Sequence, residues 1–315
     1  MIHHIMNRGE RMKYRRLGKT DLKVSVVGVG TWQFGGDWGK DFNQPEVDRI
    51  LNRAKELGIN LLDTAECYGP HHMSENFIGN FLSRDRREDW IIASKFGHHW
   101  EDQWQNAWDT KQVRLQLEES LKALRTDYID LYQFHSGSDE VFNNDDMWTM
   151  LDKQVQAGTI RHLGISIGSN KNIYQTNRAS ELNAKAIQVV YNRLEQEPEA
   201  EVLPSCMEQD LGVLARVPLA SGFLSGKYKP GTVFTDNVRK NRDREENEAK
   251  LRLVEEIQRT EVPAGANMAE WALAWCLQHP AVSCVIPGCK SVEQVEANAK
   301  AVDLVRVDHP GTWRN

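Results

Sequence analysis

The sequence lacks the features of a membrane, secreted or nucleic-acid-binding protein. In its 315 residues, no apolar run approaches the roughly 20 residues that a membrane-spanning helix needs. The N-terminal residues lack the apolar core of a signal peptide. The net charge is −6 and the pI is near 6.0, so no basic surface for nucleic acid is expected. These absences favour an enzyme or a binding protein of the cytoplasm.

Cysteine is also scarce, and neither the cysteines nor the histidines are spaced as in a typical redox or metal site. The five cysteines, at positions 67, 206, 276, 284 and 289, include no C-x-x-C pair, so we expect free thiols in a reducing compartment. Two pairs of adjacent histidines, at 71–72 and 98–99, lie in expected loops. Adjacent histidines of this kind rarely form a metal site, and we expect no metal.

What the sequence does contain is a regular series of short apolar segments, each typical of a buried strand. Eight such strands are expected, at Val26–Gly30, Ile59–Asp63, Trp90–Lys95, Tyr128–His135, Ile160–Ser166, Ala186–Tyr191, Gly212–Leu219 and Val282–Pro287. The segments that follow them have helical periodicity and are expected at Pro45–Leu57, Ser74–Ser83, Thr110–Leu124, Asp145–Ala157, Lys171–Ala179, Glu199–Gln209, Ala266–Gln278 and Val292–Val302. Strands that alternate with helices indicate a parallel sheet.

Eight such units in one chain predict a closed (β/α)8 TIM barrel. An N-terminal hairpin is expected around the turn in residues 14–25, and an extra helix, Glu248–Arg259, after strand seven. A doubly wound open sheet is the alternative, weakened because Gly28–Gly35 lacks the G-x-G-x-x-G pattern. We expect residues 1–11 to be a disordered extension and residues 12–315 to form a single barrel domain.

A charged stretch, residues 236–246, interrupts the regular alternation before the extra helix. Long loops of a barrel are usually functional lids or disordered segments. Because most of the stretch is ionisable, its simplest interpretation is a solvated, mobile face.

Three of the expected strands end on an ionisable residue, namely Asp63, Lys95 and His135, and Tyr68 follows the first of them by five residues. In a barrel of this kind, the carboxyl ends of the strands form one rim, where the chemistry takes place. An unperturbed phenol has a pKa of about 10. A lysine ammonium beside Tyr68 would lower that pKa, and Asp63 could hold the lysine charged. The set suits proton delivery to a carbonyl oxygen.

The same residues lie in segments that resemble the aldo-keto reductase superfamily. The similar segments are Leu17-Gly-Lys-Thr-Asp-Leu-Lys-Val-Ser25, Asp63-Thr-Ala-Glu-Cys-Tyr-Gly69, Ser94-Lys95, Asp127-Tyr-Ile-Asp-Leu-Tyr-Gln-Phe-His135 and Ile286-Pro-Gly288. The resemblance extends from Met12 to about Val305 and is strongest to the bacterial branch related to potassium-channel β-subunits and to general aldehyde or sugar reductases.

The resemblance implies a reductase that takes hydride from NADP(H), without a metal, and acts on a small carbonyl substrate. It assigns Tyr68 as general acid, Lys95 as the partner that lowers its pKa, Asp63 as the anchor of that lysine, and His135 as the residue that orients the carbonyl.

The resemblance also implies the cofactor contacts. Adenosine 2′-phosphate would meet Lys290 and Ser291, and adenine would meet Gln294 and Asn298. The remaining implied contacts are Gly30, Thr31, Trp32, Ser166, Gln188, Arg216, Leu219, Ser221, Gly222, Leu224, Lys227 and Gly288. The helix that begins near Ser291 favours an anion independently, since its first N–H groups and its dipole point at such a ligand.

Two positions depart from the pattern of the family. Many members have Gly-Val-Ser-Asn where this chain has Gly164-Ile-Ser-Ile167, so the asparagine contact is missing or moved to Asn192. Many members have an aromatic residue where this chain has Arg216. A guanidinium can stack on a flat ring, or it can meet an anionic substrate or the pyrophosphate.

Two other functions stay open at this point. One is a nucleotide-binding regulatory subunit, and the other is a lyase or isomerase that uses Lys95 as a Schiff base. Trp32, Trp100, Trp104 and Trp108 are candidate walls of a substrate pocket. No nucleic-acid or membrane partner is expected, and the oligomeric state, including a homo-oligomer, is open.

Overall fold

The computed structural model describes residues 12–99 and 106–306, whose elements alternate as the sequence predicts. The strands are β1 Tyr14–Arg16, β2 Lys23–Ser25, β3 Val29–Gly30, β4 Leu61–Asp63, β5 Ile91–Phe96, β6 Ile129–His135, β7 Ile160–Ser166, β8 Ala184–Val190, β9 Gly212–Arg216 and β10 Val282–Val285. The α-helices are α1 Gln44–Glu56, α2 Met73–Leu82, α3 Thr110–Leu124, α4 Asp139–Phe142, α5 Asp145–Gln156, α6 Ile173–Asn177, α7 Val202–Glu208, α8 Arg244–Thr260, α9 Met268–Gln278 and α10 Val292–Ala299. Residues 1–11, the predicted disordered extension, lie outside the described residues.

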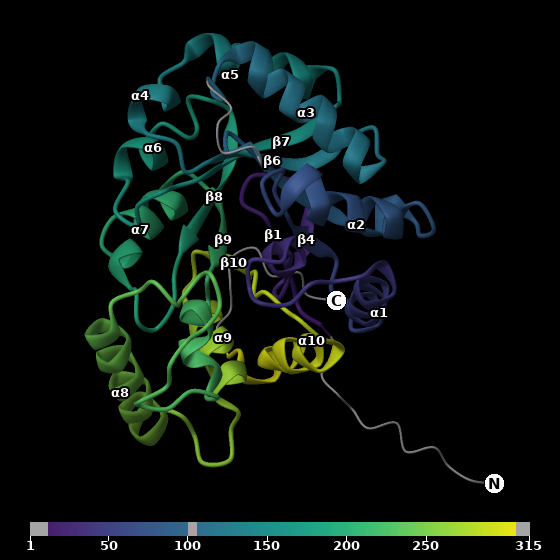
Figure 1. The fold of residues 1–315 in the computed structure, drawn as a ribbon. Coiled ribbons are helices and arrows are strands. Elements are labelled where there is room, and N and C mark those ends of the chain that lie inside the picture. The colour runs from purple at the N-terminus through teal and green to yellow at the C-terminus, as the bar shows by residue number, and fades with distance from the viewer. Residues whose placement is uncertain (1–11, 100–105, 307–315) are drawn as a thin grey trace, which may run out of the picture.

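Eight parallel strands follow one another in chain order from β3 to β10, and helices surround them (Figure 1). The sheet closes on itself, because β3 and the end of β10 pair through Val27 with Val285 and Gly30 with Gly288. Three backbone hydrogen bonds join these segments, from Gly28 N to Val285 O (2.8 Å), from Val285 N to Val26 O (2.9 Å) and from Gly30 N to Pro287 O (3.0 Å). The predicted (β/α)8 barrel is therefore confirmed, and a doubly wound open sheet is excluded by the closure.

The interior of the barrel has an apolar layer below a polar one. Alternation along each strand sends every second side chain inward, so β4 contributes Leu61 and then Asp63, and β6 contributes Leu131 and then Gln133. The apolar layer is one buried cluster of Leu17, Val24, Leu61, Ile91, Ala93, Leu131, Ala186, Leu214, Cys284 and Ile286. Since Leu17 and Val24 belong to the β1–β2 hairpin, the hairpin closes this end of the barrel. The opposite end receives the polar residues.

Most predicted boundaries are correct to within two residues, and local signals explain why. α1 begins with a capping box between Asn43 and Glu46, has proline in its first turn, and is followed by Gly58 at a φ of 80°. α6 is shorter than predicted, and the four-residue α4 was not predicted. The first strand is also shorter, because residues 26–28 join the sheet only through isolated pairing.

The seventh strand of the barrel, β9, ends at Arg216 rather than at the predicted Leu219. Val217, Ala220 and Ser221 all have positive φ, between 48° and 55°. Such a run cannot continue a strand, so the chain turns over the rim at this point. A pattern of apolar residues could not indicate this turn.

Most of the charged stretch 236–246 is exposed, as the sequence predicts, but one of its arginines is buried. Arg239 is only 6% exposed, and its side chain pairs with Asp236 at 2.8 Å. Its guanidinium lies over the rings of Phe234 (4.3 Å) and Tyr228 (4.8 Å). Aromatic faces and a paired carboxylate stabilise a buried guanidinium, which a count of charges along the sequence does not reveal.

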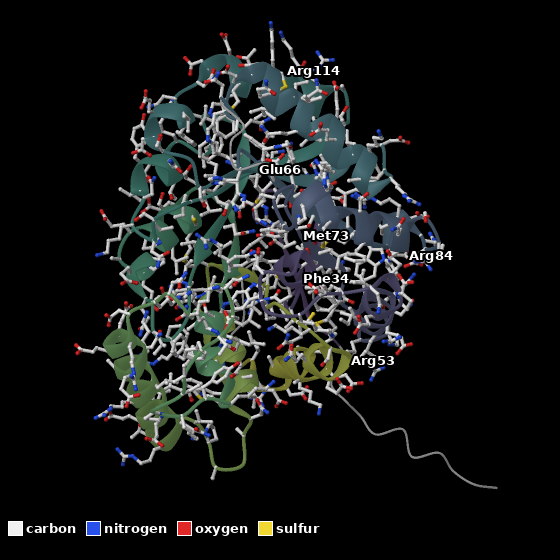
Figure 2. All side chains as sticks on the ribbon, in the orientation of Figure 1. Phe34, Arg53, Glu66, Met73, Arg84 and Arg114 are labelled. Atoms are coloured by element: carbon white, nitrogen blue, oxygen red, sulfur yellow. The ribbon has the colours of Figure 1, made fainter. Side chains whose placement is uncertain are left out.

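Side chains fill the interior of the barrel and the space between strands and helices (Figure 2). In that view Arg53, Arg84 and Arg114 lie at the periphery, whereas the fully buried Glu66 lies in the middle. All five cysteines are free thiols, as predicted. Among the described residues, no helix combines the length and the apolar character needed to cross a membrane.

Candidate active site

The polar end of the barrel gathers the ionisable residues that terminate three neighbouring strands. In the register of the sheet, Asp63 pairs with Ala93, Lys95 with Gln133, and His135 with Ser166. All of these strands run parallel, so their last inward-facing side chains meet at the same rim.

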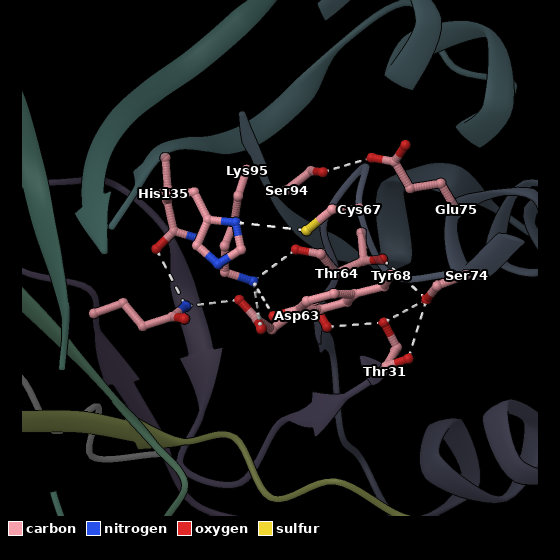
Figure 3. A network of polar contacts seen from close by, with 12 residues as sticks. Thr31, Asp63, Thr64, Cys67, Tyr68, Ser74, Glu75, Ser94, Lys95 and His135 are labelled. Carbon is pink, nitrogen blue, oxygen red and sulfur yellow. Dashed lines mark hydrogen bonds and ion pairs between the residues drawn. The ribbon is translucent and has the colours of Figure 1, made fainter. Parts of the chain in front are cut away.

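Lys95 lies at the centre of this group, fully buried (Figure 3). Its Nζ donates to Asp63 Oδ2 (2.8 Å), to Thr64 O (2.7 Å) and to Tyr68 Oη (3.1 Å). The three protons of the ammonium are therefore all engaged. Asp63 uses its second oxygen to accept from Gln188 Nε2 at 2.7 Å. The lysine is fixed by a paired carboxylate and directed at the phenol.

The pKa of Tyr68 moves in the direction opposite to the one expected from the sequence. Burial raises this pKa to about 12, and the opposing effect of the Lys95 ammonium is smaller. The sequence indicates a lysine beside the phenol, but it does not indicate how much hydration the phenol loses in the folded protein. Tyr68 is therefore a phenol, not a phenolate, throughout the physiological pH range.

His135 is held in its neutral form. Burial, followed by the positive charge of Lys95, keeps its pKa well below 6.5. Its Nδ1 lies 3.9 Å from the Cys67 sulfur, and its ring contacts that of Tyr68 edge-on, with centroids 6.2 Å apart. A neutral imidazole can donate one hydrogen bond while leaving the other nitrogen as an acceptor.

The rim opens into a cavity of about 850 Å³ that runs from these residues to α10. Asp63, Tyr68 and His135 line it, and Lys95 lies beneath them. It is also lined by most residues of the predicted cofactor set: Gly30, Thr31, Trp32, Gln188, Arg216, Leu219, Ser221, Gly222, Lys227, Gly288, Lys290, Ser291, Gln294 and Asn298. A cavity of this size accommodates a ligand larger than a simple aldehyde.

Two residues of the predicted cofactor set do not line the cavity. Leu224 is fully buried in an apolar cluster with Phe223 and Leu251, so its side chain serves packing. Ser166 is fully buried at the end of β7, next to His135 in register, and its Oγ has no hydrogen-bond partner among the described residues.

Asn192, to which the asparagine contact was expected to have moved if it is not missing, does not line the cavity. The side chain of Asn192 donates to Glu195 Oε2 (2.7 Å) and to Val217 O (3.1 Å), and it accepts from Leu194 N (2.9 Å). These contacts use it entirely to hold the turn after β8.

Of the predicted tryptophan walls, Trp32 lines the cavity and stacks near Tyr68, with centroids 6.1 Å apart. Trp108 instead packs on Phe134 in the core, at 4.5 Å. Trp100 and Trp104 lie outside the described residues.

The far end of the cavity carries several positive charges. Lys290 precedes α10, where Ser291 caps the first turn by accepting from Gln294 N. Burial and the neighbouring cations Arg239, Lys227 and Lys40 lower the pKa of Lys290. Lys290 Nζ also donates to Trp38 O at 2.6 Å. Cations brought this close to one another favour an anionic ligand between them.

Sequence reasoning missed several residues that line the cavity: Gln33, Asp37, Trp38, Cys67, His98, Tyr228, Arg239 and Asn267. Arg239 extends from the charged loop to Ser221 O (3.2 Å), and Arg242 donates to Ser221 Oγ (3.0 Å). These two arginines join the loop to the turn after β9. Gln33, Cys67 and Tyr228 each adjoin a predicted site residue in the sequence, which was a signal available for them. No feature of the local sequence indicated that Arg239 lines the cavity.

Arg216 is placed between the two ends of the cavity. Its Nη2 donates to Ile167 O at 3.1 Å, and its buried Nε has no partner among the described residues. Burial lowers its pKa, although Tyr68 and Asp63 act in the opposite direction. An N–H group that lacks an acceptor inside a cavity is a donor available to a ligand.

Comparison with known proteins agrees with this geometry. Residues 26–309 match the model of the "Aldo/keto reductase family". The chain is 33% identical to "Uncharacterized oxidoreductase YqkF" of Bacillus subtilis (strain 168) over 94% of this chain and 93% of the relative. It is 29% identical to "Probable voltage-gated potassium channel subunit beta" of Oryza sativa subsp. japonica over 93% and 92%.

Among solved structures, the fold is similar to that of "aldo-keto reductase AKR11C1 from Bacillus halodurans (holo form)". The TM-score is 0.78 at 31% sequence identity, covering 95% of this chain and 93% of the other. With the barrel, the buried lysine–aspartate pair and the tyrosine above it, these similarities establish that the chain belongs to the aldo/keto reductase family of oxidoreductases.

Proposed function

We propose that this protein reduces an aldehyde or ketone to an alcohol with NADPH, and that the same site allows the reverse oxidation. The observation that carries the proposal is the contact of the buried Lys95–Asp63 pair with the hydroxyl of Tyr68 at the wall of the cavity. That arrangement presents a proton donor where charge develops on a carbonyl oxygen.

The residues around the cavity fit a dinucleotide. Ser166 Oγ and Arg216 Nε are buried polar atoms that have no partner in the described part of the chain. Gln188 donates its amide protons to Asp63 and Gln133, which leaves its oxygen as an acceptor. These groups would hold the nicotinamide end. The cations near Lys290 and the N-terminus of α10 would hold the phosphates. When bound, the cofactor would supply hydride to the carbonyl carbon.

The residues of the chain itself would perform the proton transfer. Tyr68 Oη donates its proton to the carbonyl oxygen, and Lys95 stabilises the charge that the phenol then carries. Asp63 keeps the lysine protonated and aimed. His135, neutral, donates a second hydrogen bond to the same oxygen and so orients the carbonyl. No residue forms a covalent bond to the substrate.

The two alternative functions have less support. A Schiff-base lysine must be a free amine, whereas contacts with Asp63 and Tyr68 raise the pKa of Lys95 despite its burial. A regulatory subunit is suggested by the potassium-channel relatives, but the complete set of acid, lysine and carboxylate argues for turnover.

Binding and turnover together test the proposed function. NADPH and NADH are titrated by fluorescence, and turnover is then measured with a panel of simple aldehydes. Binding with turnover supports the reductase. Binding without turnover of any carbonyl would favour the regulatory subunit, and no binding of either nucleotide would contradict the cofactor assignment.

Replacing Lys290 by methionine is expected to weaken NADPH binding about tenfold, or about 1.4 kcal/mol, because one cation facing the 2′-phosphate is lost. NADH lacks this phosphate, and its affinity should be unchanged. The matched control is Lys300→Met, which removes the same charge from an exposed position at the end of α10. Equal losses for both nucleotides would contradict a 2′-phosphate site at Lys290.

The pH dependence of the two directions should differ in sign. Reduction needs the protonated phenol, which persists below the Tyr68 pKa of about 12, so kcat for reduction should be flat from about pH 6 to 10. Oxidation needs the phenolate, whose fraction rises about tenfold per pH unit below that pKa. Steady-state rates in both directions measure this. A reduction rate that already declines above neutral pH would contradict a raised pKa of Tyr68.

We also propose a cytoplasmic location, because all five thiols are free and four of them are buried.

A further inference from the structure

A cluster of three potential metal ligands lies beside the active-site cavity. It consists of His72, at the end of the 3-10 turn Pro70–His72, His99, three residues beyond β5, and Glu119 in α3. The Nε2 atom of His72 lies 3.4 Å from Glu119 Oε2, and the Nε2 atom of His99 lies 3.6 Å from the same oxygen. All three ligand atoms lie within 4.8 Å of one another.

These separations suit a single ion. Zinc bonds of about 2.0–2.2 Å in tetrahedral geometry place neighbouring ligand atoms about 3.4 Å apart. Two of the three separations are close to this value without any movement of the backbone. Two imidazoles and one carboxylate form a ligand set for a borderline divalent cation such as Zn²⁺, with the fourth position left to water.

The orientation of His72 also suits a ligand. Its Nδ1 donates to Glu75 Oε2 at 2.8 Å, and Ser94 Oγ in turn donates to Glu75 Oε1 at 2.5 Å. Carboxylates that hold the far nitrogen of a ligating histidine are a usual part of metal sites, since they fix the tautomer and the ring. Nε2 of His72 and Oε2 of Glu119 are buried and make no hydrogen bond among the described residues.

The surroundings hold an excess of buried carboxylate. Glu66 and Glu75 are fully buried near Glu119, and Glu66 Oε2 also has no hydrogen-bond partner in the described part of the chain. In Figure 2 Glu66 lies in the middle of the view, away from the outline of the molecule. Burial, together with the charges of Glu75 and Glu119, raises the pKa of Glu66 well above its ordinary range. A cation at this place would offset the repulsion.

We propose that His72, His99 and Glu119 bind one zinc ion. The ion ties the start of α2, the segment after β5 and the middle of α3 together. Its role is structural, but it lies beside the substrate region, because His98 and His99 line the cavity and the ring of His98 contacts that of His135 at 5.0 Å. The proposal does not depend on the proposed reaction.

The prediction of no metal considered each pair of adjacent histidines separately. The ligands come from three separate elements, one histidine from each pair and a glutamate from a helix. Only the folded chain brings Glu119 beside both.

Zinc binding is tested with the full-length chain after chelator treatment. His3 and His4 are a second potential zinc ligand pair in the sequence, so both are first replaced by alanine in the parent protein. Zn²⁺ is titrated against a chromophoric chelator, and metal content is measured by mass spectrometry. Co²⁺ is added separately, because a four- or five-coordinate cobalt site absorbs strongly in visible light.

Adjacent residues provide matched control variants. His71 and His72 both have positive φ, 53° and 56°, a conformation that asparagine tolerates, so His72→Asn is compared with His71→Asn. Glu119→Gln, which keeps the size of the side chain, is compared with Glu118→Gln on the exposed face of the same helix. Circular dichroism in zinc-free buffer checks that each variant folds.

The expected result is one zinc ion per chain in the parent and in both controls. Affinity should decrease at least about tenfold in His72→Asn and in Glu119→Gln, with loss of the visible cobalt absorption. The rise of Tm on adding zinc should disappear in the same two variants. Stoichiometry well below one in the parent, or zinc affinity in Glu119→Gln equal to that in Glu118→Gln, would overturn the proposal.

Discussion

Replacing Tyr68 by phenylalanine is expected to lower kcat for carbonyl reduction about a thousandfold, within the range that general acid catalysis supplies. The phenyl ring should stay in place, because Trp32 stacks on it and Lys95 lies 4.8 Å from its centre. The hydroxyl is the one group that is lost, so nucleotide affinity should be retained. Steady-state kinetics and nucleotide titration on the same preparation separate the two effects.

The control for this variant is Tyr174→Phe, which removes a hydroxyl from a residue that is 41% exposed and does not line the cavity. Turnover of Tyr68→Phe close to that of the control would exclude Tyr68 as the proton donor. It would leave His135 as the nearest remaining donor.

Replacing Lys95 by methionine should affect both activity and stability. Asp63 would keep its contact with Gln188 but would lose its charged partner, and a buried ion pair broken on one side costs about 3–5 kcal/mol of unfolding free energy. In addition, kcat should decrease about 10²–10³-fold, because the charge that developed on Tyr68 would no longer be stabilised. Urea denaturation and steady-state kinetics measure the two losses.

A double variant separates the structural effect from the chemical one. Combining Lys95→Met with Asp63→Asn removes the unpaired carboxylate, so most of the lost stability should return. Turnover should not return, since the ammonium beside the phenol is still absent. Recovery of turnover together with stability would mean that the pair only supports the fold.

Much of the fold could be predicted from local patterns. β7 and α3 have the predicted boundaries, because the apolar patterns of those segments are not disturbed by the rest of the molecule. The end of β9 was missed because the positive φ angles of Val217, Ala220 and Ser221 are imposed by the turn over the rim. The signal that the sequence did offer is Pro218 inside the predicted strand, because proline cannot continue a central strand.

The candidate site was predictable for a related reason. Asp63, Lys95 and His135 occupy the last inward positions of parallel strands, and position along a strand is a property of the sequence. Arg239 was not predictable, because its burial depends on rings from other segments that surround it. The direction of the Tyr68 pKa was missed because hydration is lost only when the barrel closes around the phenol.

The sequence by itself determined the alternation of strands and helices, the polar rim and the position of the proposed proton donor, since each depends on residues close together in the chain. The tertiary structure decided what depends on separated segments. These include the pairing of residues 27–30 with 285–288 that closes the barrel, the burial of Arg239, and the meeting of His72, His99 and Glu119. The physical reason is that hydration, charge and ligand geometry depend on distances in space, which spacing along the chain does not specify.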